Sequence, residues 1–132
     1  MRNTKLIGDV TETKVLSALV EKGWAMSVPW GENCKYDLVG DDGDKIHRIQ
    51  CKTGRLRNGS VIFRTHTSHV HRGGGLEGYK GKADLFGVYC PDNGSIYLIP
   101  VDEVPDTYAY LRVEPTKNNQ SEGIRFAKEY KL

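Results

Sequence analysis

Four polar side chains in the N-terminal half of the sequence have the types and spacing that metal-assisted phosphodiester chemistry requires. Asp37 lies in a short apolar run, and Gln50 and Lys52 stand two residues apart in an alternating run. Glu12 precedes them in a segment with helical spacing. Carboxylate and amide oxygens suit a divalent cation such as Mg²⁺, and an ammonium group can stabilise negative charge that develops on a phosphoryl group. The pattern indicates a site that brings a metal ion and a phosphate together.

A β-hairpin is the element expected to position three of these side chains. The runs Tyr36–Val39 and Ile46–Lys52 read as two strands, and the residues between them are rich in glycine and aspartate, which favour a tight turn. Successive strand residues face opposite ways, so Gln50 and Lys52 should share one face while the residues beside them face the other. Asp37 would then lie next to the amide and the ammonium.

A helix over Thr4–Lys22 is expected to supply the fourth side chain. Gly23 follows as a C-cap, and Glu12 lies at helical spacing before a stripe of apolar residues. A carboxylate on the core-facing side needs a partner, which can be a metal ion or an ordinary salt bridge. The apolar residues of this stripe are Leu16, Leu19 and Val20.

The rest of the chain alternates strands with turns. A glycine-rich connection over 69–82 separates two groups of strands, and Asn118 to Ser121 offer caps for a last helix with Ile124, Ala127 and Lys128 at helical spacing. This order predicts one α/β domain over residues 1–132, a mixed α+β sheet flanked by helices. The expected strands are Trp24–Trp30 at an edge, Val61–Thr67, a buried Ala83–Cys90, Ser95–Val101 and Tyr108–Val113.

Composition describes an ordinary soluble protein. The chain has 132 residues, a hydrophobic content of 38% and a net charge of +2. No apolar run is long enough to span a bilayer or to act as a signal region, so we expect a cytoplasmic protein without a membrane partner. Cys34, Cys51 and Cys90 are too few and too scattered for a disulfide framework, and buried thiols are the expected reading.

The positive charge is concentrated in the middle of the chain. Between Lys52 and Lys82 the sequence has seven basic residues and one acid, Glu77. Such a segment is typical of a protein that binds a phosphate backbone, although a merely solvated basic face has the same composition. The three histidines here could alternatively ligate a metal, but no cysteine or acid completes the set. The candidate DNA-contacting residues are Arg55, Arg57, Arg64, His66, His69, His71, Arg72 and Lys80.

The order of helical Glu12, strand Asp37 and the Gln50-x-Lys52 pair resembles the PD-(D/E)xK nuclease superfamily, which includes restriction enzymes and archaeal Holliday junction resolvases. Within it the chain looks most like the small intron-encoded homing endonucleases that carry glutamine in place of an acid. The segments 83–89 and 116–120 also look like that branch. Two departures from the superfamily motif are Tyr36 in place of proline and Gln50 in place of a carboxylate.

The resemblance implies a restriction-endonuclease-like core and a site-specific endonuclease that hydrolyses double-stranded DNA with Mg²⁺, for which Mn²⁺ can substitute. Asp37 would be the central metal ligand, with Gln50, the backbone carbonyl of Cys51 and Glu12 completing the shell. Lys52 would orient the attacking water or stabilise the transition state. A homodimer or homotetramer would supply one site for each strand. A Holliday junction resolvase and a catalytically silent DNA-binding module remain as alternatives.

Overall fold

The computed structural model describes residues 3–31, 33–67, 77–116, 118 and 121–132. It opens with α1 (Thr4–Glu21), as the sequence predicts. Asn3 caps the helix, because its side-chain oxygen accepts a hydrogen bond from the Leu6 N–H at 3.1 Å. At the other end Gly23 adopts a positive φ of 97°, which a residue with a side chain rarely takes.

The buried face of α1 differs from the predicted stripe. Thr11, Val15 and Leu19 are the buried residues of the helix, one per turn at a spacing of four. Val20 is 55% exposed, so its assignment to the stripe was wrong. The difference is a small rotation of the helix on the sheet, and it moves Glu12 from the centre of the contact to its margin.

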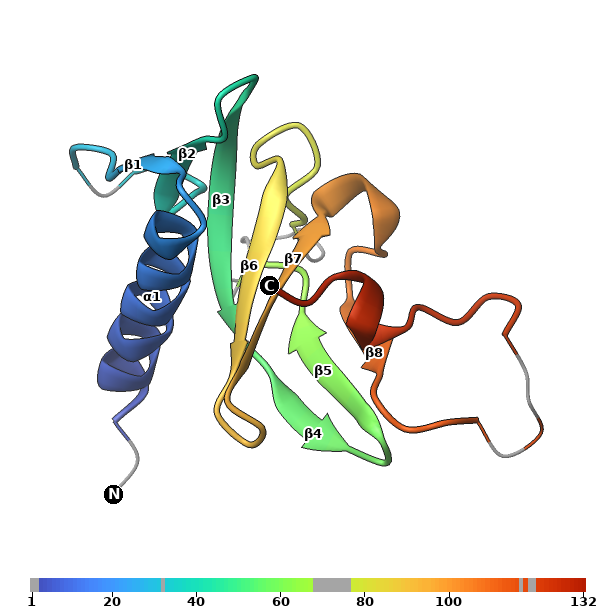
Figure 1. Ribbon diagram of the computed structural model, residues 1–132. Helices are drawn as coiled ribbons and strands as arrows, with labels where there is room; N and C mark the ends of the chain where they lie inside the picture. The colour runs from blue at the N-terminus through green and yellow to red at the C-terminus, as the bar shows by residue number, and fades with distance from the viewer. Residues whose placement is uncertain (1–2, 32, 68–76, 117, 119–120) are drawn as a thin grey trace.

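A five-stranded sheet packs against α1 (Figure 1). Only β3 and β6 pair in parallel, and the other neighbours are antiparallel. The chain leaves this sheet after β3 and returns at β6, so the elements between them form a separate layer. In spatial order the strands are β1 (Ala25–Ser27), β2 (Leu38–Asp41), β3 (Ile46–Thr53), β6 (Leu85–Cys90) and β7 (Ser95–Pro100).

The predicted alternation along β3 is confirmed. Ile49 and Cys51 are buried in the cluster that includes Val15 and Leu19 of α1. Gln50 and Lys52 alternate with them and therefore face the opposite side of the sheet. The preceding strand lies two residues later than predicted, because β2 begins at Leu38 and leaves Tyr36 and Asp37 just before it.

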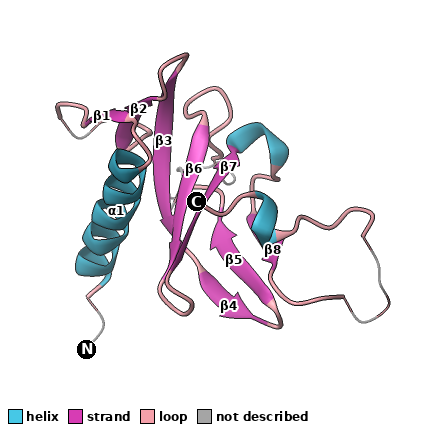
Figure 2. Ribbon diagram, viewed as in Figure 1, coloured by secondary structure: helices cyan, strands magenta, loops and turns pink. Residues whose placement is uncertain are grey.

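A three-stranded antiparallel sheet of β4 (Arg55–Arg57), β5 (Ser60–Arg64) and β8 (Tyr108–Arg112) forms the second layer (Figure 2). The strands expected from the sequence did not include β4, which lies in the segment between the predicted strands Ile46–Lys52 and Val61–Thr67. Asn58 and Gly59 both have positive φ, 51° and 79°, which suits the two-residue turn between β4 and β5. The inner face of this sheet packs on the first one, where Phe63 meets Phe86 edge to face at 5.5 Å.

The C-terminal segment is not the helix that the sequence predicted. Its described residues contain a short 3₁₀ turn, η2 (Ala127–Glu129). Another 3₁₀ turn, η1 (Val101–Glu103), lies outside this segment and follows β7. Isolated bridges pair Arg112 with Phe126 and Tyr97 with Lys131. These backbone contacts hold the segment extended along both sheets, which competes with helix formation.

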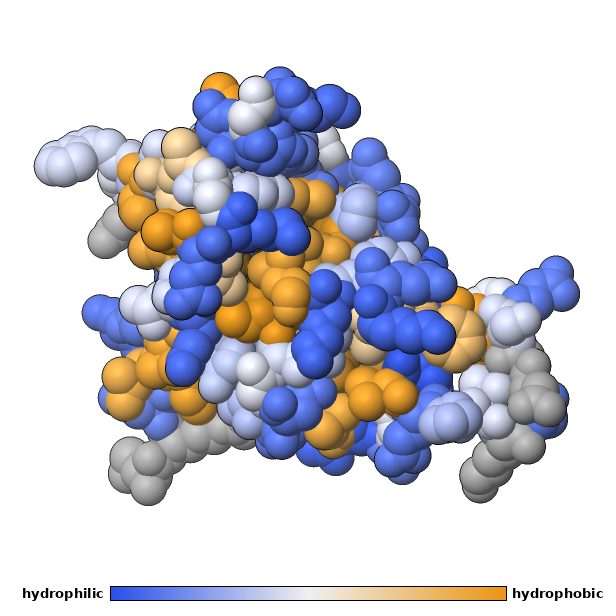
Figure 3. All heavy atoms as spheres, viewed as in Figure 1, coloured by the Kyte–Doolittle hydropathy of each residue, from blue (hydrophilic) through white to orange (hydrophobic). Residues whose placement is uncertain are grey.

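Close packing between α1 and the five-stranded sheet fixes the helix in place. A Cβ atom added to Gly87 of β6 would lie 2.6 Å from Cγ1 of Val15. The glycine thus lets the helix approach the strand closely. Outside this contact apolar side chains are scattered among polar ones, as Figure 3 shows, and Leu6 and Val10 of α1 are among the exposed ones.

No helix among the described residues is long and apolar enough to cross a membrane. All three cysteines are free thiols; Cys51 and Cys90 are buried, whereas Cys34 is exposed. Burial raises the pKa of both buried thiols, which keeps them protonated at neutral pH.

Candidate active site

Asp37 is anchored to the backbone of β3. Its own N–H donates to the Ile49 carbonyl at 2.8 Å, which extends the β2–β3 ladder by one bond. Its Oδ2 then accepts the Cys51 N–H at 2.9 Å. The carboxylate therefore takes the place that a strand carbonyl would occupy. Burial raises the pKa of Asp37 above its usual value, while the Cys51 N–H and the nearby Lys52 ammonium act in the opposite direction.

Glu12 reaches the same corner from α1. The helix is tied to β3 beside it, since the hydroxyls of Thr11 and Thr53 lie 2.6 Å apart. Burial raises the pKa of the half-buried Glu12, and the charge of Asp37 raises it further. Both carboxyl groups line a pocket of about 160 Å³. The pocket is also lined by Val28, Pro29, Gly31, Cys34 and Tyr36.

The electrostatics of this pocket fit a divalent cation. Asp37 is among the causes that raise the pKa of Glu12, so the two carboxylates repel each other in a partly desolvated site. A cation between them would relieve that repulsion, and oxygen donors are what Mg²⁺ prefers. Burial, followed by the charges of Asp37 and Glu12, raises the pKa of the Cys51 thiol, which disfavours a thiolate at this position. Among the described residues no three His, Cys, Asp or Glu side chains form a metal-binding group.

Gln50 is the amide side chain that the sequence predicts as a further ligand. It follows Ile49, to which Asp37 is bonded, and it lies beside Phe86 in the parallel pairing of β3 and β6. Its Nε2 is 3.4 Å from the Cys51 carbonyl oxygen. The two oxygen donors predicted as ligands, the Gln50 amide and the Cys51 carbonyl, therefore come from adjacent residues on one strand.

Lys52 follows Cys51 in β3, and its side chain is half-buried. Its Nζ donates to the His66 carbonyl and to the Tyr79 hydroxyl, both at 3.1 Å. Burial lowers the pKa of Lys52 to about 8; Asp37 counteracts this shift and Arg64 adds to it. The ammonium and the Asp37 carboxylate thus influence each other across the end of β3.

A groove of about 790 Å³ opens beside Lys52, between the first turns of α1 and the outer face of the three-stranded sheet. None of the described residues that line it is acidic. Two exposed tyrosines on β8, Tyr108 and Tyr110, belong to this surface, although neither was among the DNA-contacting candidates. Their alternation with buried Ala109 and Leu111 is the signal that places them on the outer face. The polar and aromatic residues of the groove used below are Lys52, Arg55, Arg57, Arg64, Tyr108 and Tyr110.

The other predicted DNA-contacting residues lie elsewhere. His66 is only 6% exposed, and its ring Nδ1 is 2.8 Å from the Thr107 carbonyl oxygen. This ring is therefore buried against the backbone at Thr107 and is not among the residues that line the groove. Lys80 is exposed, with Nζ 3.9 Å from a carboxylate oxygen of Asp106. The remaining three candidates, His69, His71 and Arg72, lie outside the described residues.

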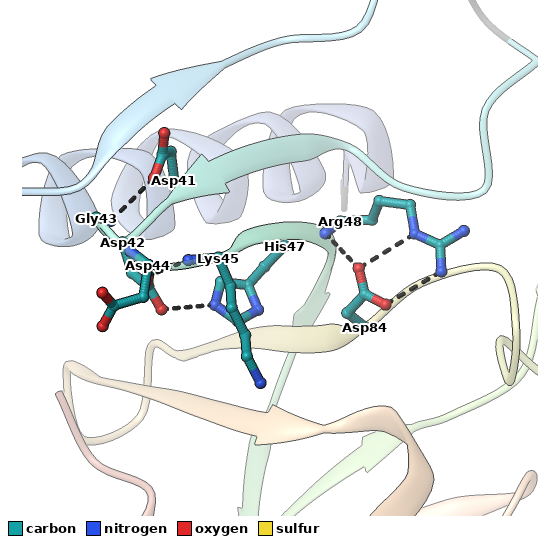
Figure 4. A network of polar contacts seen from close by, with 8 residues as sticks. All are labelled: Asp41, Asp42, Gly43, Asp44, Lys45, His47, Arg48 and Asp84. Atoms are coloured by element: carbon teal, nitrogen blue, oxygen red, sulfur yellow. Dashed lines mark hydrogen bonds and ion pairs between the residues drawn. The ribbon is translucent and has the colours of Figure 1, made fainter.

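A second polar network aligns the start of β3 and is separate from the carboxylate pocket (Figure 4). Oδ2 of Asp84 accepts hydrogen bonds from the backbone N–H of Arg48 at 2.7 Å and from its Nε at 3.1 Å. Oδ1 of Asp84 accepts a third bond from Nη2 of Arg48 at 3.1 Å. The guanidinium holds the pKa of the Asp84 carboxyl below its usual value. At the hairpin turn, Asp42 pairs with His47 at 2.8 Å.

Comparisons with known proteins place the chain in a family and a fold. The family model of PD-(D/E)XK endonucleases matches residues 2–132. The solved structure of a bacterial homing endonuclease, I-Ssp6803I, resembles this one with a TM-score of 0.77 at 20% sequence identity, over 98% of this chain and 89% of that chain. No curated protein matches the sequence. The structural likeness establishes a restriction-endonuclease-like fold, and the family match extends over almost the whole sequence. The chain therefore belongs to the PD-(D/E)XK endonuclease family.

Proposed function

We propose that this nuclease is a magnesium-dependent, site-specific endonuclease that hydrolyses double-stranded DNA, with Mn²⁺ able to replace Mg²⁺. One observation carries the proposal: the Asp37 carboxylate is bonded to the Cys51 N–H, one residue from Lys52, and shares a pocket with Glu12. This brings acids from a helix and a strand to the same end of β3 as an ammonium. Phosphodiester hydrolysis needs those groups together.

The residues that would hold the ion are the carboxylates of Asp37 and Glu12, the amide oxygen of Gln50 and the carbonyl of Cys51. When bound, the ion supplies charge neutralisation and an acidified water. Asp37 is the central ligand because its orientation is fixed by the backbone of β3. Gln50 brings no negative charge, so we expect the substrate phosphate to contribute to metal affinity.

Lys52 acts on the reacting phosphate. Its ammonium orients the attacking water or stabilises the negative charge of the transition state. The arginines of the groove bind the DNA backbone on the same side, since Arg55, Arg57 and Arg64 line the groove together with Lys52. One chain carries one such site, so cleavage of both strands calls for a homodimer or homotetramer, which we place in the cytoplasm.

Cleavage of plasmid DNA by purified protein tests the proposal. Wild type should nick and linearise plasmid with Mg²⁺ and lose that activity in EDTA. Lys52→Ala should abolish cleavage but keep DNA binding, because the change removes transition-state stabilisation and leaves the arginine surface intact. If wild type shifts DNA on a gel but never cuts it, the protein is a DNA-binding module and the enzyme proposal fails.

Substrate shape separates this proposal from a junction resolvase. Linear duplex and a four-way junction of matched sequence should be cut side by side under single-turnover conditions. We expect the linear site to be cut at least as fast as the junction. A strong preference for the junction would replace the site-specific reading with that of a resolvase.

A crystal soaked with Ca²⁺ or Mn²⁺ tests the metal site directly. We expect density for one ion between Glu12 and Asp37, with the Gln50 amide oxygen turned toward it. Asp37→Asn soaked in the same way is the matched control and should show weaker density or none. An ion found at the histidine-containing segment instead would contradict the ligand set.

A further inference from the structure

Tyr79 contacts the Lys52 ammonium in two ways. Its hydroxyl oxygen accepts a hydrogen bond from Lys52 Nζ at 3.1 Å. The ammonium also lies 4.7 Å from the centroid of the phenol ring, within the range of a cation–π interaction. Tyr79 lies 27 positions after Lys52 in the sequence. Only the folded chain brings them together.

The Tyr79 side chain is itself held rigidly. It is 5% exposed, and its ring packs edge to face on Phe86 at 5.6 Å. Phe86 in turn lies in β6, the strand that pairs in parallel with β3. The backbone carbonyl of Tyr79 accepts the N–H groups of Lys82 and Ala83, both at 2.9 Å. A phenol fixed in this way can hold a flexible neighbour at one place.

The orientation of a lysine ammonium has to be fixed by neighbouring groups. Its four-carbon stem is flexible, and its ammonium carries three N–H donors. In Lys52 the His66 carbonyl and the Tyr79 hydroxyl accept two of the three, among the described residues. These two acceptors fix the direction of the third N–H relative to the strand. The Lys52 ammonium can then present a single donor to a bound phosphate or water.

We propose that Tyr79 is a positioning residue of the active site, which holds the Lys52 ammonium in the orientation that cleavage requires. The inference rests on the proposed function and assigns to this side chain a role that the sequence did not indicate. Tyr79 acts through Lys52 and is not expected to touch the DNA.

Tyr79→Phe is the informative substitution. It keeps the ring, its packing on Phe86 and the cation–π contact, and it removes only the hydroxyl. We expect the single-turnover cleavage rate at saturating DNA to fall on the order of 10-fold, as for the loss of one hydrogen bond to a charged group. The dissociation constant for DNA should stay within about twofold, because the basic groove is unchanged.

Tyr97→Phe is the matched control. Tyr97 is also buried, at 2% exposure, and its hydroxyl accepts a hydrogen bond from Asn93 Nδ2 at 3.1 Å. It lies on β7, away from β3, so its loss should leave the cleavage rate unchanged. Equal rates for the two variants would overturn the proposal, as would a Tyr79→Phe enzyme that loses DNA affinity but keeps its rate at saturation.

A double-mutant cycle on stability separates this inference from the nuclease proposal. Urea unfolding of wild type, Lys52→Met, Tyr79→Phe and the double variant needs neither DNA nor metal. If Tyr79 holds the ammonium, the effects of the two changes are not additive. If the wild-type protein cuts no DNA, only the proposed nuclease function fails. The double-mutant cycle would still show whether Lys52 and Tyr79 are energetically coupled. Additive effects would overturn the positioning role whether or not the protein is active.

Discussion

The two sheets of this protein handle polar groups in opposite ways. At the end of β3 in the five-stranded sheet, polar side chains are half-buried and bonded to backbone groups, as Asp37 is to Cys51 and Lys52 is to His66. On the three-stranded sheet, Arg55 and Arg64 project from the outer face and are exposed. One arrangement fixes atoms in place at the expense of hydration, and the other keeps charge available to a partner.

Under the proposed function, this difference would correspond to a division between chemistry and binding. Groups that must act on one bond need fixed positions, which buried hydrogen bonds provide. Groups that attract a polyanion need charge and exposure, and they can tolerate motion. Substitutions in the first sheet should therefore change the rate of cleavage, whereas substitutions in the second should change affinity. Four predictions test that division, from the largest expected effect to the smallest.

Asp37→Asn should give the largest effect. The amide oxygen can still accept the Cys51 N–H, so the hairpin should stay intact, but the central negative ligand is lost. We expect cleavage to slow on the order of 10³-fold, as loss of several kcal/mol of metal-derived stabilisation implies. DNA affinity in a gel-shift assay without metal should be equal or higher, because a negative charge is removed.

Asp41→Asn is the control for that change. Asp41 lies in the same hairpin, is exposed and accepts a bond from Gly43 N–H at the turn. Its variant should cut DNA at the wild-type rate. If Asp37→Asn cleaves normally, the carboxylate pocket is not the site of chemistry and the division between the sheets fails.

Gly87→Ala tests whether the first sheet depends on its helix. The new Cβ would meet Val15 and Ile49, so the variant should lose about 1–3 kcal/mol of unfolding free energy through overpacking. Displacement of α1 moves Glu12 from Asp37, and cleavage should fall further than DNA affinity. Chemical denaturation and a gel shift on the same preparation measure both.

Gly8→Ala is the control for the effect of Gly87→Ala on unfolding free energy, which is measured without DNA. A Cβ at this helical glycine meets nothing within 4 Å, so alanine should stabilise the helix slightly. A Gly87→Ala protein as stable as wild type would show that the helix and β6 can separate without strain.

Arg64→Ala tests the second sheet. The loss of one phosphate contact should weaken DNA binding by about 10-fold and reduce the slope of log affinity against log salt by about one. The cleavage rate at saturating DNA should be unchanged. Fluorescence anisotropy at several salt concentrations gives both numbers.

Lys45→Ala removes the same charge from the β2–β3 turn, at the far end of β3 from the groove (Figure 4). It should leave the salt slope as it is in wild type. A drop equal to that of Arg64→Ala would mean that total charge, rather than the outer face of the sheet, governs affinity.

Asp84→Asn should affect neither chemistry nor binding and only slightly reduce stability. Its pair with Arg48 is more than a third exposed, so solvent screening limits the loss to about 1 kcal/mol. The pKa of Asp84 is lowered in the folded state, so its contribution is present above the unfolded pKa of about 4 and disappears as pH falls through the lower folded value. Urea unfolding at pH 7 and at acidic pH should show the difference between the two proteins shrink.

Asp44→Asn, at the exposed turn, is the matched control and should not reproduce that pattern. A large loss of cleavage in Asp84→Asn would mean that the start of β3 also controls the positions of Gln50 and Lys52, and the boundary drawn around the site would need to be widened.

Long or strongly patterned elements of the fold could be predicted from the sequence. α1, β3, β6 and β7 carry helical spacing, alternation or apolar runs bounded by turns, and the structure contains all four. β4 has three residues, too few to show alternation, and Asn58-Gly59 was the local signal for its hairpin. The predicted last helix failed because tertiary bridges such as Arg112 to Phe126 hold that segment extended.

The site was predictable where it depends on the order of residues along the chain. Glu12 and Asp37 do line one pocket, as their helix and strand positions indicated. The partners of Lys52 could not be predicted, because His66 and Tyr79 lie 14 and 27 positions after it and only the fold brings them to its ammonium. The burial of His66 could not be predicted either, because its ring is bonded to the carbonyl of Thr107, which lies 41 positions later in the sequence.

The passage from one sheet to the other takes a single residue, Gly54, between β3 and β4. It is buried, its N–H donates to Tyr89, and a Cβ there would lie 2.8 Å from Val61. Such a short and buried junction limits movement of the three-stranded sheet, with Arg55, Arg57 and Arg64, relative to the end of β3 that carries Lys52. If the proposed function holds, the number of base pairs between the contacted phosphates and the cut would be set by this covalent junction.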